Sequence, residues 1–179
     1  DSRVFSGFLG DAEDHFDTLE TRQKILVLWG HGGGMVMLDQ DPAPGQHHSR
    51  ASIVDFAEKL EVRSRSPQDP LRFDIIAFDS CYMGVLETMH QFRGFADYAL
   101  VSSTVVDASG YPYKPIVANL IAKGPALDPA LSADMIRNEY NSHYEKLGRL
   151  KRRYLFSCDL TDAVATGADP RWEGEGRGA

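Results

Sequence analysis

The chain has 179 residues, of which 42% are hydrophobic and 25% are charged, and its formal net charge is −7. This length and composition predict one globular domain with a core of ordinary size. The negative charge argues against nucleic acid as a partner, because phosphate binding requires a basic surface. No apolar run is long enough to cross a bilayer, so we expect no membrane partner either.

In chain order, the first expected element is an amphipathic helix over residues 1–20. Residues 24–29, a continuous apolar run, predict the first strand. A helix is expected next, over residues 51–62, with Ser52 and Asp55 spaced as a capping box.

The rest of the chain continues this alternation of strands and helices. The further expected elements are strands at residues 73–78, 98–102 and 154–158 and helices at residues 83–93, 112–123 and 129–147. Strands that alternate with helices predict an α/β fold. Because the strands are apolar throughout rather than at every second residue, we expect a mostly parallel sheet covered on both faces.

The two cysteines of the chain are too few for a disulfide framework. Cys81 and Cys158 each lie at or just past the end of an apolar run. Burial as a small core residue is the default interpretation of a lone cysteine, and we adopt it for Cys158.

A histidine set among glycines follows the first strand, in the sequence GHGGG, with the histidine at position 31. A dinucleotide fingerprint is excluded, because its sixth position is Met35 and no helix pattern follows. The Gly-Lys-Ser/Thr sequence of a phosphate loop and the Gly-x-Ser-x-Gly sequence of a lipase are both absent. His47 and His48 are adjacent rather than spaced to chelate, so we predict no metal site. Taken alone, GHGGG would also suit a tight turn.

A second reactive side chain follows the second strand. Cys81 lies 50 residues after His31, which is the spacing of the histidine and cysteine in caspases. Reactive groups of α/β folds gather at the carboxyl ends of the strands, and neighbouring parallel strands would bring these two residues to one edge of the sheet. The sequence therefore predicts a His–Cys pair.

Three segments, LVLWGHGGG, FDIIAFDSCYMGVLET and FADYALVSSTVVDASGYPY, resemble clostripain-type cysteine peptidases of the caspase-like clan. The resemblance covers most of residues 24–113. It implies a caspase-like αβα sandwich with a mostly parallel central sheet, and hydrolysis of peptide bonds after Arg or Lys.

The resemblance also implies roles for single residues. His31 would be the catalytic histidine and Cys81 the nucleophile, and the backbone N–H groups of Gly32 and Cys81 would form the oxyanion hole. Asp79 would be the carboxylate beneath the specificity pocket; from the residues alone, it could equally be the N-cap of the next helix.

The loop after the third strand supplies two more candidate substrate-binding residues, Ser103 and Asp107. Relatives are expected to carry a further acid near the sequence ASGY, where this chain has Ser109.

These residue types suit the hydrolysis of an amide. Cysteine attacks as the thiolate, and we expect Cys81 at the start of a helix, where the dipole favours negative charge. His31 can give a proton to the leaving nitrogen. A glycine after the histidine lets a backbone N–H group approach the reacting carbonyl without a Cβ in the way.

The expected peptidase domain covers residues 1–165, and the glycine-rich residues 166–179 are expected to form a mobile tail. The resemblance also implies a strand and helices before the histidine strand, of which this chain is expected to lack the family's full set, so another chain or segment is expected to complete the sheet. The chemistry needs no cofactor; calcium is suggested by the resemblance alone.

Self-cleavage of a precursor is also implied by the resemblance. Arg50, expected in the polar loop that begins at Asp39, is the first candidate, and Arg63 and Arg65 are the alternatives.

Two other functions stay open: a catalytically silent caspase-like module with an assembly or regulatory role, and a thiol hydrolase acting on other amides. The presence of both His31 and Cys81 favours the peptidase.

Overall fold

The computed structural model describes residues 2–18, 23–38, 50–63, 71–124, 127–148 and 154–161. The expected polar loop before Arg50, the alternative cleavage residue Arg65 and the expected tail at residues 166–179 lie outside this part of the chain.

Within the described residues, a central sheet has the strand order β1-β5-β6-β7. β1, β5 and β6 are parallel, and β7 runs antiparallel to β6. The bounds are Ile25–Trp29 for β1, Phe73–Asp79 for β5, Ala96–Val101 for β6 and Phe156–Asp159 for β7. Each predicted strand is therefore present, and the mostly parallel sheet is confirmed.

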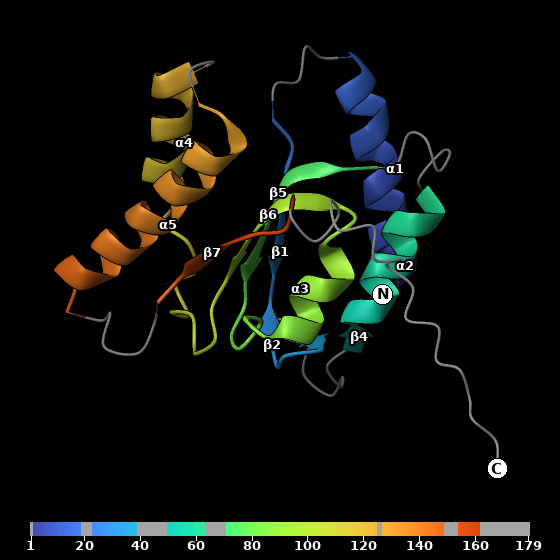
Figure 1. Ribbon diagram of the computed structural model, residues 1–179, viewed down its shortest axis with the longest axis horizontal. Coiled ribbons are helices and arrows are strands. Elements are labelled where there is room, and N and C mark those ends of the chain that lie inside the picture. Colours follow the sequence, from blue (N-terminus) through green and yellow to red (C-terminus); the bar gives the residue numbers. More distant parts are fainter. Residues whose placement is uncertain are drawn as a thin grey trace.

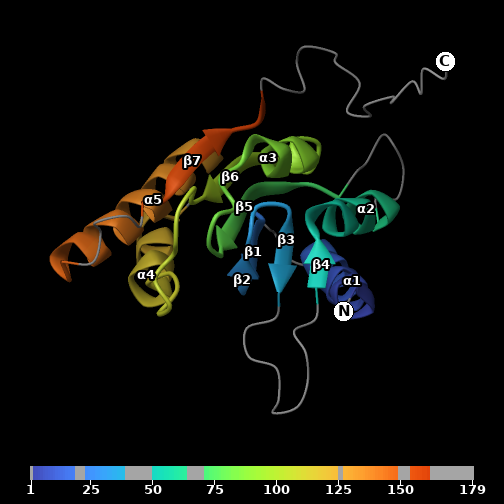
Figure 2. The ribbon, with the colours of Figure 1, turned by 90° about the horizontal axis from the view of Figure 1, so that it is seen from below.

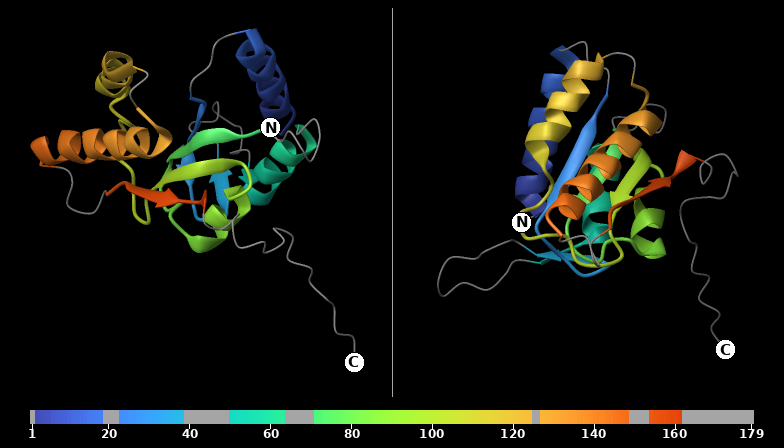
Figure 3. Two further views of the ribbon diagram at one scale, coloured as in Figure 1. Left: turned by 45° about the horizontal axis from the view of Figure 1, so that its top comes forward. Right: turned by 90° about the vertical axis from the view of Figure 1, so that its left-hand side faces the viewer.

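Helices cover both faces of the sheet, so the molecule has three layers (Figure 1). One face carries α1 (Ser2–Thr18), α2 (Ile53–Arg63) and α3 (Leu86–Phe92), and the other carries α4 (Tyr113–Lys123) and α5 (Pro129–Lys146). Figure 3 shows from a further side that α4 and α5 lie apart from α1 and α2. The predicted αβα layering is confirmed. No helix among the described residues has the length and apolar character needed to cross a membrane.

The central strand β5 shows why its sequence is apolar at successive positions. Ile76 and Phe78 belong to the core under α1, α2 and α3, whereas Ile75 and Ala77 belong to the core under α4 and α5. Successive side chains of a strand point to opposite faces, so a strand buried on both sides has no polar face.

The helix ends largely follow the sequence signals. The Asp55 N–H donates to Ser52 Oγ (3.0 Å) and the Ser52 N–H donates to Asp55 Oδ2 (3.1 Å), which confirms the capping box at the start of α2. Asp128 caps α5 by accepting a hydrogen bond from the Leu131 N–H (2.8 Å). α3 differs, because it begins at Leu86, three residues later than predicted.

A second, small antiparallel sheet in the described residues is absent from the sequence prediction. Its order is β2-β3-β4, with bounds His31–Gly32, Val36–Leu38 and Arg50–Ser52. Figure 2 shows it beside the end of β1. Strands of two or three residues are too short for a periodicity to be read, so the sequence suggested only a loop here.

The structure corrects the expected position of Arg50. This residue begins β4, where it pairs with Leu38 of β3, rather than lying in a loop; its side chain is exposed.

Candidate active site

The carboxyl ends of β1 and β5 lie side by side. Trp29, the last residue of β1, pairs in register with Asp79, the last residue of β5. Beyond this pair, the Gly30 N–H still donates to the Asp79 carbonyl (3.4 Å). His31 and Cys81 each follow two residues after a paired strand end, so the structure places them at the same edge of the sheet, as the sequence predicts.

Gly32 lies directly against the backbone that carries Cys81. A Cβ at Gly32 would overlap the carbonyl oxygen of Cys81, and it would come within 2.8 Å of Met83 Sδ and 2.9 Å of Ser80 Cβ. Real Cβ atoms do not approach other atoms so closely, so this contact requires glycine. The glycine after the histidine therefore brings two strand ends into contact.

The turn that carries His31 is held by hydrogen bonds to two helices. The Thr88 hydroxyl of α3 donates to the Gly34 carbonyl (2.9 Å), and the Ile53 N–H at the start of α2 donates to the Met35 carbonyl (2.9 Å). His31 itself is exposed in β2. The imidazole is thus presented to solvent from an ordered hairpin.

The loop after β6 holds the Cys81 segment. The Val106 N–H donates to Cys81 Sγ (3.3 Å), and the Sγ in turn lies 3.8 Å from the Val106 carbonyl. The Tyr82 N–H donates to the Thr104 carbonyl (2.8 Å). Tyr82 has a φ of 59°, in the left-handed region, so the backbone turns sharply just after the cysteine.

This arrangement corrects the expected role of a helix dipole. α3 begins at Leu86 with Val85 as its N-cap, so Cys81 does not lie at a helix N-terminus. The backbone donor that reaches the sulfur is instead the Val106 N–H. Sequence reasoning missed Val106, because a backbone donor leaves no signal in the residue type.

The candidate substrate-binding residue Ser103 lies in the same loop. It is exposed, and its hydroxyl donates to the Gly84 carbonyl (2.9 Å). A Cβ at Gly84 would come within 2.7 Å of that hydroxyl, so the segments after β5 and β6 are closely packed.

Asp79 is buried at the end of β5, with 3% of its surface exposed. Its Oδ2 accepts hydrogen bonds from the Tyr111 N–H (2.9 Å) and the Tyr113 hydroxyl (2.6 Å). Burial raises the pKa of this carboxyl above its ordinary value, and the hydrogen bonds from Tyr113 and Tyr111 oppose the increase. Asp79 does not cap α3, whose N-cap is Val85.

Asp107, the other candidate acid, is buried in the loop between β6 and α4. Its Oδ1 accepts from the Ser109 N–H (3.0 Å), and its own N–H donates to the Tyr140 hydroxyl (3.3 Å). Burial raises the pKa of Tyr140 to about 12, so this phenol stays neutral in the physiological range. These contacts indicate that Asp107 shapes the loop around Asp79.

A model of the clostripain family matches residues 1–161 of the chain. The chain belongs to the clostripain family.

Solved structures of related proteins have the same fold. A secreted C11 cysteine protease from Bacteroides thetaiotaomicron, in complex with an irreversible peptide inhibitor, is 27% identical, with a TM-score of 0.69. An inactive zymogen C11 protease from Parabacteroides distasonis is 22% identical, with a TM-score of 0.62. The alignments cover 94% and 92% of this chain but 47% and 42% of those chains, so it spans about half of their length. The caspase-like fold is confirmed, and no curated protein matches the chain significantly.

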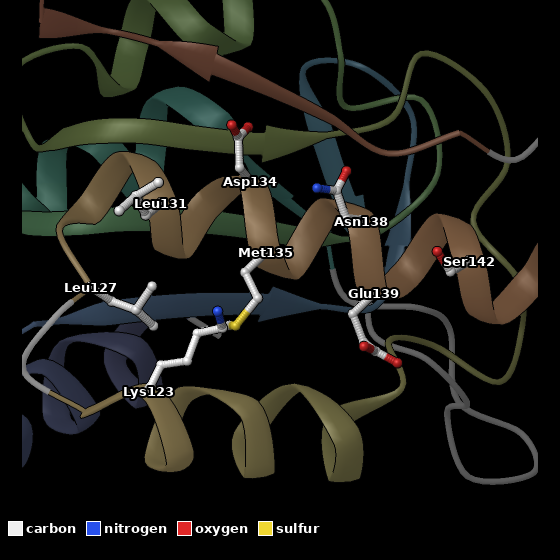
Figure 4. A pocket seen from close by; sticks show the side chains of 8 residues that line it. All are labelled: Lys123, Leu127, Leu131, Asp134, Met135, Asn138, Glu139 and Ser142. Atoms are coloured by element: carbon white, nitrogen blue, oxygen red, sulfur yellow. The ribbon is translucent and has the colours of Figure 1, made fainter.

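A groove of about 480 Å³ lies between α4 and α5 of this clostripain-family chain (Figure 4). Its two carboxylates already have partners, since the Asn119 side-chain amide donates to Glu139 (3.0 Å) and Arg137 pairs with Asp134 (3.1 Å). None of the sequence-predicted site residues lines it. We therefore place the candidate site at the strand ends instead.

The described residues hold no group of three His, Cys, Asp or Glu side chains that could bind a metal ion. Calcium, which the resemblance suggests, thus finds no candidate site in this part of the chain. Cys158 is half-buried and packs against the core under α1, α2 and α3, and burial raises the pKa of its thiol, in line with the core interpretation.

The raised pKa of Asp79 predicts a pH dependence of folding stability. A carboxyl with a higher pKa in the folded than in the unfolded state binds more protons when folded, so its contribution to the free energy of unfolding falls as the pH rises from 3.8. Asp79→Asn should remove this decline, which amounts to about 1.4 kcal/mol per unit of pKa difference. Urea unfolding at a series of pH values measures it, with Asp14→Asn as a control for the loss of one exposed charge. A constant stability difference between Asp79→Asn and wild type across the series would contradict the prediction.

Proposed function

We propose that this chain is the catalytic part of a cysteine endopeptidase in which Cys81 is the nucleophile and His31 is the general acid and base. The observation that carries the proposal is the contact of Gly32 with the Cys81 backbone, which joins the histidine strand end to the cysteine strand end. The 27% identical relative, which is described as a cysteine protease with a bound peptide inhibitor, supports the same reaction class.

The reaction begins when the Cys81 thiol gives its proton to His31 and the resulting thiolate attacks the carbonyl carbon of the substrate. The Val106 N–H stabilises the sulfur anion before attack. The carbonyl oxygen becomes an oxyanion, and the N–H groups of Gly32 and Cys81 are the proposed donors to it. The C–N bond then breaks, His31 gives its proton to the departing amine, and a thioester remains on Cys81.

Hydrolysis of the thioester completes the cycle. His31, now neutral, takes a proton from water, and the resulting hydroxide attacks the thioester carbonyl. The C–S bond breaks, the acid product leaves and the Cys81 thiolate is restored.

We further propose that the peptidase cleaves after Arg or Lys, with Asp79 as the carboxylate that pairs with the basic side chain. The proposal is supported by the sequence position of Asp79, two residues before Cys81. Ser103 is exposed in the loop that holds the Cys81 segment, and Asp107 supports that loop, so both are proposed to shape the same pocket.

Fluorogenic peptides with Arg, Lys, Asp or an apolar residue before the cut test this function in the intact protein. We expect turnover of the Arg and Lys peptides and its loss after alkylation of the thiol. Turnover of non-peptide amides alone would indicate a different thiol hydrolase. Silence towards every substrate, by a protein with no uncut precursor segment, would indicate a catalytically silent module.

Self-processing is a separate proposal, with cleavage after Arg50. The side chain is exposed, but its peptide group lies in the β3–β4 pairing, so cleavage requires local separation of these strands. Wild type should be cut and Cys81→Ala should stay intact on a denaturing gel. Identical fragments from the variant would assign the cut to another protease.

We also propose that a further polypeptide segment completes the sheet beside β1. In the described residues β1 is an edge strand, and its side chains Val27 and Trp29 are 39% and 61% exposed. Amide hydrogen exchange of β1 should be slower when such a segment is bound than in residues 1–179 alone; equal rates would contradict the proposal.

A further inference from the structure

The two carboxylate oxygens of Asp79 are in different states. Oδ2 accepts two hydrogen bonds, from the Tyr111 N–H and the Tyr113 hydroxyl, which fill both of its lone pairs. Oδ1 is buried and has no hydrogen-bond partner among the described residues. Buried polar atoms without a partner are rare in native proteins, so this oxygen marks a position for a donor from a ligand.

The loop around Asp79 packs directly against the carboxylate. A Cβ at Gly110, whose φ is +70°, would come within 2.7 Å of Oδ2, so the loop backbone lies against the carboxylate. The Tyr144 hydroxyl donates to the Gly110 carbonyl (2.5 Å), and the Tyr111 hydroxyl donates to the Phe78 carbonyl (3.2 Å). The loop thus fixes the orientation of the carboxylate, with one oxygen at the two tyrosine donors and the other buried without a donor among the described residues.

This asymmetry limits how a basic side chain can pair with the carboxylate. A guanidinium gains most from a bidentate pair, in which two N–H groups meet two carboxylate oxygens. An ammonium is a point charge with rotatable donors and is satisfied by one oxygen. With Oδ2 occupied, the carboxylate offers one oxygen to either group.

We propose that Tyr113 is a specificity-determining residue: by occupying Oδ2, it makes Asp79 pair end-on with a basic side chain and so removes the advantage of Arg over Lys. The inference rests on the proposed function in taking Asp79 as the floor of the pocket. It assigns the balance between the two basic residues to a side chain that sequence reasoning did not select.

Binding of n-butylguanidinium and n-butylammonium to the intact protein tests the proposal without any need for turnover. NMR titration gives the two dissociation constants for wild type and Tyr113→Phe, with Tyr154→Phe as a matched control and Asp79→Asn as a check on the site. Wild type should bind the two cations with similar affinity. Tyr113→Phe frees one lone pair of Oδ2, so the affinity ratio should shift toward the guanidinium on the order of tenfold. The kcat/KM ratio for Arg and Lys peptides should shift in the same direction, mainly through KM.

Two outcomes overturn the inference: a ratio that Tyr113→Phe leaves unchanged in a variant that still binds the cations, or no binding of either cation to wild type. A general loss of structure would lower both affinities and leave the ratio as it was. Peptide hydrolysis, measured separately, distinguishes the two proposals. Cleavage only after apolar residues would support the peptidase proposal and contradict this inference. The expected ratio shift in a protein that hydrolyses no peptide would support this inference and contradict the peptidase proposal.

Discussion

Cys81→Ala should abolish peptide hydrolysis, with a loss in kcat of up to about 10⁶-fold, as expected when the nucleophile of a covalent mechanism is removed. The variant should stay folded, because the sulfur is half-buried and the bond lost with the Val106 N–H contributes about 1 kcal/mol to stability. Cys81→Ser keeps an acceptor for that N–H and should be equally inactive, since an unactivated hydroxyl is a weak nucleophile. Initial rates with an Arg or Lys peptide, together with urea unfolding, measure both effects.

Cys158→Ala is the matched control for this prediction. Cys158 lies in β7 against the core, and burial raises the pKa of its thiol, so it is protonated and unreactive near neutral pH. The control should keep most of its activity, and alkylation should modify Cys81 first. Full activity in Cys81→Ala, or loss of activity in Cys158→Ala alone, would show that Cys81 is not the nucleophile.

The central layer of the fold could be predicted from the sequence, because strands buried on both faces have continuous apolar runs. The start of α2 could also be predicted, because the capping box of Ser52 and Asp55 is a local hydrogen-bond pattern that the sequence contains. The start of α3 could not be predicted. Hydrogen bonds of Tyr82 and Gly84 to the loop after β6 keep the chain after Cys81 out of a helix, and such contacts come from distant residues.

The candidate site divides in the same way. The sequence predicts that His31 and Cys81 lie at one edge of the sheet, because each follows the carboxyl end of an apolar strand and the two strands are successive along the chain. The Val106 N–H and the Tyr113 hydroxyl do not, because their importance depends on which atoms the fold brings next to Sγ and Oδ2. A tyrosine near a helix start can have many roles, and only the hydrogen bond from the Tyr113 hydroxyl to Asp79 Oδ2 indicates the one proposed here.

Gly32→Ala should both destabilise the protein and reduce its activity. The added methyl group would overlap the Cys81 carbonyl oxygen, a backbone atom that cannot move aside as the end of a flexible side chain could. Overpacking of this kind typically costs about 1–3 kcal/mol of stability. If the N–H groups of Gly32 and Cys81 hold the oxyanion, separating them should also lower kcat by roughly 10²–10³.

Gly33→Ala is the control that separates this contact from a general intolerance of side chains in the GHGGG turn. A Cβ at Gly33 meets no atom within 4 Å, and its N–H can still donate to the Val36 carbonyl. The control should therefore keep near wild-type stability and activity. Because the two substitutions are adjacent and chemically identical, equal losses in both would show that the turn needs flexibility. A loss confined to Gly32→Ala, with kcat falling more than folding stability explains, is what contact between the two strand ends requires.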